Sequence, residues 1–325
     1  MKWTLLFTLA LALAMQSLAW NQEAENLMKL VLENNRTLMV AREASQTAIL
    51  RAGTGNTPPD PEFEFGYLFG NPAQIGNKVN ILVKQEMDFP TAYAHRAKLK
   101  DIRRSRAELE YLQIRQEVLS EARQLWIRQV HLNQLSRLLN KRLQKAETIR
   151  SDVYEMMNAG EVGPLEYSQA NLMVASIESE FEEVQSQLEN TRLALLQITG
   201  GQYIEVRDTL FPGPIPIVED TLLADYRMGP GAQLHQQDRY EKERETSLAR
   251  SEHLPKISAG YFSEAIPAEA FRGFTVGISV PLWENSHTIK TARSALIQSE
   301  AQLDLYLYEQ ERKIRQKLNQ LGNLH

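Results

Sequence analysis

The stretch NAGEVGPLEYSQANLMVASIE, residues 158–178, decides the fold because it joins two long helical patterns through a short turn. From Thr91 to about Asn158 the chain contains no proline or glycine, and apolar residues recur every seven positions. A helix of this length would measure roughly 100 Å at ~1.5 Å per residue. Its apolar stripe comprises Tyr111, Val118, Leu125, Leu132, Leu139, Ala146 and Val153.

The second helical pattern begins at Pro164, a residue suited to a first helical turn, and Gly200-Gly201 ends it after Thr199. Its apolar residues recur at alternating spacings of four and three, with Thr191 in the one weak position. Because only residues 158–163 separate the two patterns, we predict an antiparallel coiled-coil hairpin. The second stripe comprises Ala170, Val174, Ile177, Phe181, Val184, Leu188, Leu195 and Ile198.

The periodicity changes to 2 in four short segments that flank this helical region, which predicts four strands in two hairpins. Each strand has one apolar and one polar face. The apolar positions are Phe63, Phe65, Tyr67, Val79, Ile81, Val83, Ile257, Tyr261, Phe274, Val276 and Ile278. The polar positions include Glu62, Glu64, Asn80, Lys84, Thr275 and Ser279.

Two interpretations of this alternation stay open. The strands could form an ordinary soluble sheet that packs on the helices, or a barrel wall whose apolar side faces lipid and whose polar side lines water. Small and charged residues at the polar positions fit a water-filled lumen better than a dry core. Since a closed barrel needs about eight strands, a membrane-inserted form would have to be an oligomer that shares one barrel.

An internal repeat supports the barrel interpretation. Pro61-Glu62-Phe63 and Pro255-Lys256-Ile257 each open a strand pair that is followed by a long helical pattern. The second copy contains a helix over 220–253, interrupted at Gly229-Pro230-Gly231, and a long helix over 288–321. We therefore divide the chain into residues 1–19, a first repeat at 20–200, a linker at 201–219 and a second repeat at 220–325.

Residues 1–19 have the features of a secretory signal peptide: Lys2, an apolar run from Leu5 to Met15, and Ser17-Leu18-Ala19 at the cleavage site. The mature chain would begin at Trp20, outside the cytoplasm. The 325 residues include no cysteine, which excludes disulfides and thiolate chemistry. A net charge of −5 gives no basic field for nucleic acid.

The chemistry-bearing residues predict no enzyme. The six histidines show no pairing at i and i+4, and no Ser/His/Asp order or paired-carboxylate motif occurs. We therefore predict no catalytic residue, cofactor or metal site. Asp152, Glu155 and Glu161, near the turn, would form acidic rings if they were repeated around an axis, and such rings select cations in pores. An ordinary solvated helix surface is the alternative for each of them.

Several segments, taken in order, resemble the TolC-type outer membrane efflux proteins over essentially the whole mature chain. They are the turn at 158–178, LALLQITGG at 193–201 and FTVGISVPLW at 274–283. PDPEFEFGYLFG at 59–70 and QEMDFP at 85–90 are similar to the cation-efflux branch, which is related to CzcC and CusC.

The resemblance implies a mainly α fold with a small β part, in which long antiparallel coiled-coil helices accompany four β-strands. Three chains would form a homotrimer whose 12-stranded barrel lies in the outer membrane of a Gram-negative bacterium and continues as a periplasmic helical tunnel. Such a protein is the passive exit duct of a tripartite efflux system, here for metal cations or alternatively drugs. Its implied partners are outer-membrane lipid, a periplasmic adaptor protein and an inner-membrane pump of the RND type. The adaptor would meet the hairpin tip at Gly160, Glu161, Val162, Gly163, Pro164 and Leu165.

The sequence departs from the family pattern at one point, since the family's second repeat ends with another returning helix. The printed sequence stops at His325, which leaves a truncated sequence or a functional short form as interpretations. A periplasmic coiled-coil scaffold with a small soluble sheet is the alternative function, and it requires neither a trimer nor that helix.

Overall fold

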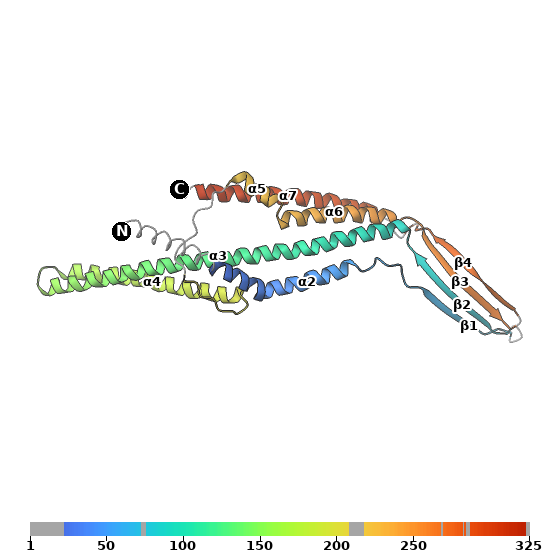
Figure 1. Cartoon of the computed structure of the whole chain (residues 1–325), viewed down its shortest axis with the longest axis horizontal. Helices are drawn as coiled ribbons and strands as arrows, with labels where there is room; N and C mark the ends of the chain where they lie inside the picture. The colour runs from blue at the N-terminus through green and yellow to red at the C-terminus, as the bar shows by residue number, and fades with distance from the viewer. Residues whose placement is uncertain are drawn as a thin grey trace, which may run out of the picture. The chain divides into compact units, whose positions relative to one another are not determined.

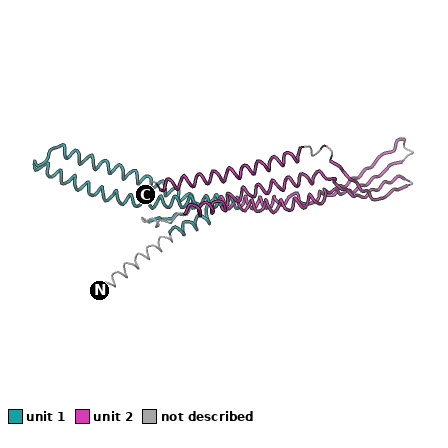
Figure 2. Tube along the Cα trace, turned by 90° about the horizontal axis from the view of Figure 1, so that it is seen from above, with its two compact units in different colours: residues 1–42, 114–216 teal, residues 43–113, 217–325 magenta. Residues whose placement is uncertain are grey.

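The computed structural model describes residues 23–72, 76–207, 218–267, 269–281, 283 and 287–322 (Figure 1). The predicted signal peptide at 1–19 and most of the predicted linker at 201–219 lie outside these residues. Figure 2 shows two compact units, residues 1–42 with 114–216 and residues 43–113 with 217–325. The boundaries of the two sequence repeats stay a prediction, because compact units group segments by contact. None of the helices in the described part is both long and apolar enough to cross a membrane.

Unit 1 contains the predicted hairpin. Helix α3 (Pro90–Asn158) continues through residues 114–158 of this unit, and α4 (Pro164–Ile198) returns beside it (Figure 1). The predicted stripes meet in the hairpin core, where Leu132 and Leu139 of α3 cluster with Val184 and Leu188 of α4. Thr191, the weak position of the predicted stripe, is buried with the other residues of the stripe. Its hydroxyl donates a hydrogen bond to the Gln187 carbonyl at 2.8 Å.

A larger core in unit 1 lies where helical residues 23–34 and the start of α2 (Arg36–Ala52) pack on the hairpin. Leu27 and Val31 bury against Trp126 and Val130 of α3 and against the end of α4. Buried Asn35 separates the two helical segments. Its Oδ1 accepts a hydrogen bond from the Leu38 amide at 3.0 Å, and its Nδ2 donates to the Ile198 carbonyl at 2.8 Å.

Unit 2 contains one antiparallel sheet of four strands, in the order β1 (Glu62–Leu68), β2 (Lys78–Met87), β3 (Lys256–Ile266) and β4 (Glu269–Ser279). The two predicted hairpins are therefore joined through β2 and β3. The first part of α3 follows β2. Helices α6 (Pro230–Ser251) and α7 (Thr288–Gly322) pack together, and the short α5 (Glu219–Arg227) lies against α7. The predicted interruption at Gly229-Pro230-Gly231 is confirmed as the break between α5 and α6.

Candidate functional site

The strand register sorts the side chains of the sheet onto two faces, because cross-strand partners point to the same side. Phe63 pairs with Val83, Val83 with Tyr261, and Tyr261 with Phe274. This face, the apolar face, carries all the residues predicted to meet lipid: Phe63, Phe65, Tyr67, Val79, Ile81, Val83, Ile257, Tyr261, Phe274, Val276 and Ile278. Phe274 is 89% exposed, and its ring meets the Tyr261 ring edge-on at 5.9 Å. The unit thus presents a mainly apolar surface with many exposed side chains, which Gln85, Ser263 and Arg272 interrupt.

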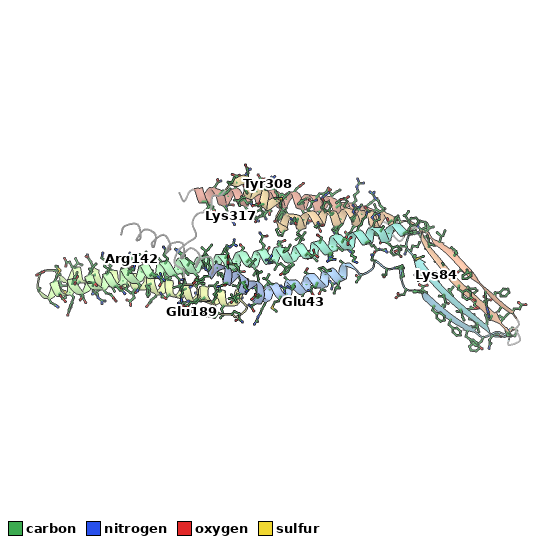
Figure 3. The ribbon with its side chains drawn as sticks, in the orientation of Figure 1. Glu43, Lys84, Arg142, Glu189, Tyr308 and Lys317 are labelled. Atoms are coloured by element: carbon green, nitrogen blue, oxygen red, sulfur yellow. The ribbon has the colours of Figure 1, made fainter. Side chains whose placement is uncertain are left out.

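The opposite face, the polar face, carries all the residues predicted to line a lumen: Glu62, Glu64, Asn80, Lys84, Thr275 and Ser279. Ion pairs link its two middle strands, β2 and β3, near both ends. Lys78 Nζ lies 2.7 Å from Glu264 Oε1, and the Glu86 carboxylate lies 3.6 Å from Lys84 Nζ and 4.0 Å from Lys256 Nζ. Figure 3 labels Lys84 on β2 and shows side chains projecting on both sides of the sheet. Whether the faces meet lipid and water stays a prediction, but the grouping of residues is now a structural fact.

Two aromatic residues on the polar face escaped the sequence analysis. Phe262 pairs with Leu82, and Phe271 pairs with Glu264, so both rings project on the charged side. The sequence signal was weak because residues 269–273, EAFRG, do not alternate in hydropathy, although β4 already begins at Glu269. The strand register places both residues: Phe262 of β3 through its pairing with β2, and Phe271 of β4 through its pairing with β3.

The two outer strands each have one open edge within the described residues. β1 pairs with β2 alone and β4 pairs with β3 alone. Each open edge presents backbone N–H and C=O groups that water or another strand must satisfy. Both edges are therefore free to pair with a further strand within the described residues.

The hairpin tip in unit 1 is closed by backbone hydrogen bonds. The Gly160 amide donates to the Met157 carbonyl at 3.1 Å, and the Glu161 amide donates to the Met156 carbonyl at 2.9 Å. Gly160 has a φ of +80°, a conformation that glycine adopts without steric cost, so the end of α3 forms a Schellman motif. Pro164 then begins α4 as predicted.

The tip exposes large apolar side chains among acidic ones, including Tyr154 and Met156 at the end of α3. Leu165, in the first turn of α4, is 67% exposed, and the predicted carboxylates Asp152, Glu155 and Glu161 are exposed as well. Of the other predicted tip residues, Gly160 and Pro164 are exposed, whereas Val162 and Gly163 are half-buried. Among the described residues, no three His, Asp or Glu side chains gather as a candidate metal site.

Unit 2 also holds an ionic cluster between α3 and α6 that the sequence analysis missed. The buried Glu241 carboxylate accepts hydrogen bonds from Arg103 Nε at 2.7 Å and Arg106 Nη1 at 2.9 Å. Burial acts to raise the pKa of Glu241, but the two arginines outweigh it and hold the pKa below its ordinary value of 4.5. A similar link joins the strands to this helix pair, since Arg96 Nη2 lies 2.7 Å from Asp88 and 3.1 Å from Glu252. These ion pairs hold α3 and α6 together in unit 2.

Solved structures of outer membrane channels share this fold. VceC of Vibrio cholerae matches with a TM-score of 0.74 and 13% identity over 94% of this chain and 80% of its own. CusC matches with a TM-score of 0.71 and 15% identity over 92% of this chain and 77% of its own. CmeC of Campylobacter jejuni matches with a TM-score of 0.71 and 17% identity over 89% of this chain and 68% of its own. No family model and no curated protein sequence matches the chain. The resemblance drawn from the sequence is confirmed for the fold.

Proposed function

We propose that this chain, which has the fold of TolC-type outer membrane channels, is one subunit of a passive export duct in the outer membrane of a Gram-negative bacterium. The observation that carries the proposal is the sheet, with an exposed apolar face, a charged opposite face and two open edges. Apolar surface left in water costs about 25 cal/mol per Å². The apolar face is therefore stabilised by lipid, while the polar face lines a water-filled lumen.

Closure of the barrel requires several copies of the chain. In hydrocarbon, each unpaired backbone group of β1 or β4 costs several kcal/mol, so the open edges must pair. The open edge of β1 in one copy is complementary to the open edge of β4 in the next. A barrel needs about eight strands or more, so at least two copies of the chain are required. The arrangement that we propose is the homotrimer with a shared 12-stranded barrel, because the resemblance to TolC-type proteins implies it.

The hairpin tip is the proposed docking site for a periplasmic adaptor protein, through Gly160, Glu161, Val162, Gly163, Pro164 and Leu165. Exposed Leu165 offers an apolar contact, and Asp152, Glu155 and Glu161 give the tip the negative charge of a pore entrance. An inner-membrane pump of the RND type would supply the energy, since the duct itself is passive. The proposed cargo is metal cations, with drugs as the alternative.

Site-directed spin labelling tests the membrane assignment, because the chain has no cysteine of its own. Phe274→Cys and Thr275→Cys are neighbours on β4 that lie on opposite faces. In outer-membrane vesicles, the label at 274 should be accessible to oxygen, which concentrates in lipid, and the label at 275 to a water-soluble nickel complex. Equal access of both labels to the nickel complex would instead favour the soluble scaffold.

Cross-linking tests the tip assignment. A photoreactive cross-linker at Glu161→Cys should capture an adaptor protein in intact cells, whereas the same group at Glu189→Cys, on the exposed side of α4, should not. Capture of the same proteins from both positions would contradict tip docking.

A further inference from the structure

Phe262 and Phe271 stand out because they lie on the face that otherwise carries charged, small and polar residues. Phe271 is paired with Glu264, which is paired with Asn80, a predicted lumen position. The Phe271 side chain is 61% exposed on this face. Membrane contact does not explain it, since lipid would meet the opposite face.

The surface beside Phe271 is bare. The next residue of β4 on the same face is Gly273, and a Cβ placed there would meet no atom within 4 Å. Thr275 and Gly277 continue the face along the strand, so β4 places no charge on this side after Phe271. Glu269, two residues before Phe271, lies on the same face. Gly273 therefore leaves open space next to Phe271 and opposite Phe262, in which the ring of a ligand can lie.

Carboxylates flank the two rings. Glu264 is the direct cross-strand neighbour of Phe271 and is held by Lys78 at 2.7 Å. Glu64 of β1 pairs with Leu82 of β2, which pairs with Phe262 of β3, so Glu64 and Phe262 lie on either side of Leu82. Glu64 forms no ion pair within the described residues. The Arg272 side chain projects on the apolar face, away from this surface. The carboxylates of Glu64, Glu264 and Glu269 outnumber the one ammonium of Lys78 near the rings, so the rings lie in a locally negative setting.

We propose that Phe271, with Phe262 and the carboxylates of Glu64 and Glu264, forms a binding site on the inner wall of the duct for organic cations that carry an aromatic ring. The aromatic ring of such a compound stacks on Phe271, and its positive charge is attracted by the ring face and by the carboxylates. A bare metal ion gains no stacking. The site rests on the proposed function, since the polar face is a lumen only in the closed barrel.

Ion current through the full-length oligomer in a planar lipid bilayer tests the site. Benzyltriethylammonium and hexyltriethylammonium carry the same charge, but only the first has a ring. The benzyl compound should block the current at about three- to fivefold lower concentration than the hexyl compound. Phe271→Leu should remove the difference, and Phe271→Tyr should retain it. Phe274→Leu, on the same strand but the opposite face, is the matched control and should leave the difference unchanged.

The outcomes separate the two proposals. If the oligomer carries no ion current, the duct fails and the site fails with it. If it carries current but blocks equally with both compounds, or if Phe271→Leu keeps the difference, the site is wrong and the duct stands. Loss of the difference in both leucine variants would likewise overturn the assignment to Phe271.

Discussion

Replacement of Glu241 by glutamine tests the ionic cluster of unit 2 most directly. Glutamine keeps the size of the side chain and one acceptor oxygen, but it removes the charge that Arg103 and Arg106 share. Hydrogen bonds to a charged group are worth about 1.5–3 kcal/mol each. Since the arginine side chains are 44% and 37% exposed, water recovers part of this loss. We expect Glu241→Gln to lower the local stability of α6 by about 2 kcal/mol.

Hydrogen exchange of the full-length protein, read by mass spectrometry, measures this effect. A loss of about 2 kcal/mol should make the amides of α6 exchange about 30-fold faster. Glu245→Gln is the matched control, because Glu245 is more exposed and pairs with Arg103 at 2.9 Å and Lys242 at 3.0 Å. Its effect should stay below about 0.5 kcal/mol. Equal exchange rates in the two variants would refute the assignment of Glu241 as the centre of the cluster.

The pH dependence gives the same cluster a second test. The folded-state pKa of Glu241 lies below its ordinary value of 4.5, so the unfolded chain binds the proton first as the pH falls. The stabilisation by the carboxylate is therefore complete at neutral pH and is lost as the pH falls below 4.5 through the depressed pKa. Protection of α6 should decline in this acid range in the wild type. In Glu241→Gln, which has no carboxyl at this position, that part of the decline should be absent.

Two further substitutions test unit 1 by thermal or denaturant unfolding. Gly200→Ala should destabilise it by about 2 kcal/mol or more, because the φ of Gly200 is +69° and the added Cβ would clash with the Asn34 backbone. Gly201→Ala should destabilise it by about half as much, because the φ of Gly201 is +95° but the added Cβ would meet no other atom. Leu139→Ala should lower the free energy of unfolding by about 3 kcal/mol, because Leu139 is 2% exposed in the hairpin core. The control Leu138→Ala should lower it by less than about 0.5 kcal/mol, because Leu138 is 53% exposed. Similar losses within either pair would contradict the packing described above.

The helices could be predicted from the sequence because their information is local. The stripe of α4 was predicted residue by residue, down to the weak position Thr191, since a seven-residue apolar repeat can be buried only along one seam. The turn at Gly160 and the stop at Gly200 were equally visible, because a helix end in the left-handed conformation strongly favours glycine.

The pairings between distant segments could not be predicted in this way. Arg103 and Glu241 lie 138 positions apart, and each looks like an ordinary charged helix residue in its own sequence window. Phe271 is a similar case, because its face depends on the register with β3 rather than on its neighbours in the chain. Sequence periodicity gives the face of a residue only where the alternation is regular, and it is not regular around Phe271.

The glycines of the sheet support the lumen assignment independently of hydropathy. Gly66, Gly260, Gly273 and Gly277 are all on the polar face, and the strands carry none on the apolar face. When a sheet curls into a barrel, side chains on the concave face converge and those on the convex face spread apart. Residues without a side chain relieve that convergence only if they lie on the concave side. A flat soluble sheet would have no reason to segregate them, so their distribution favours a sheet that closes with its charged face inward.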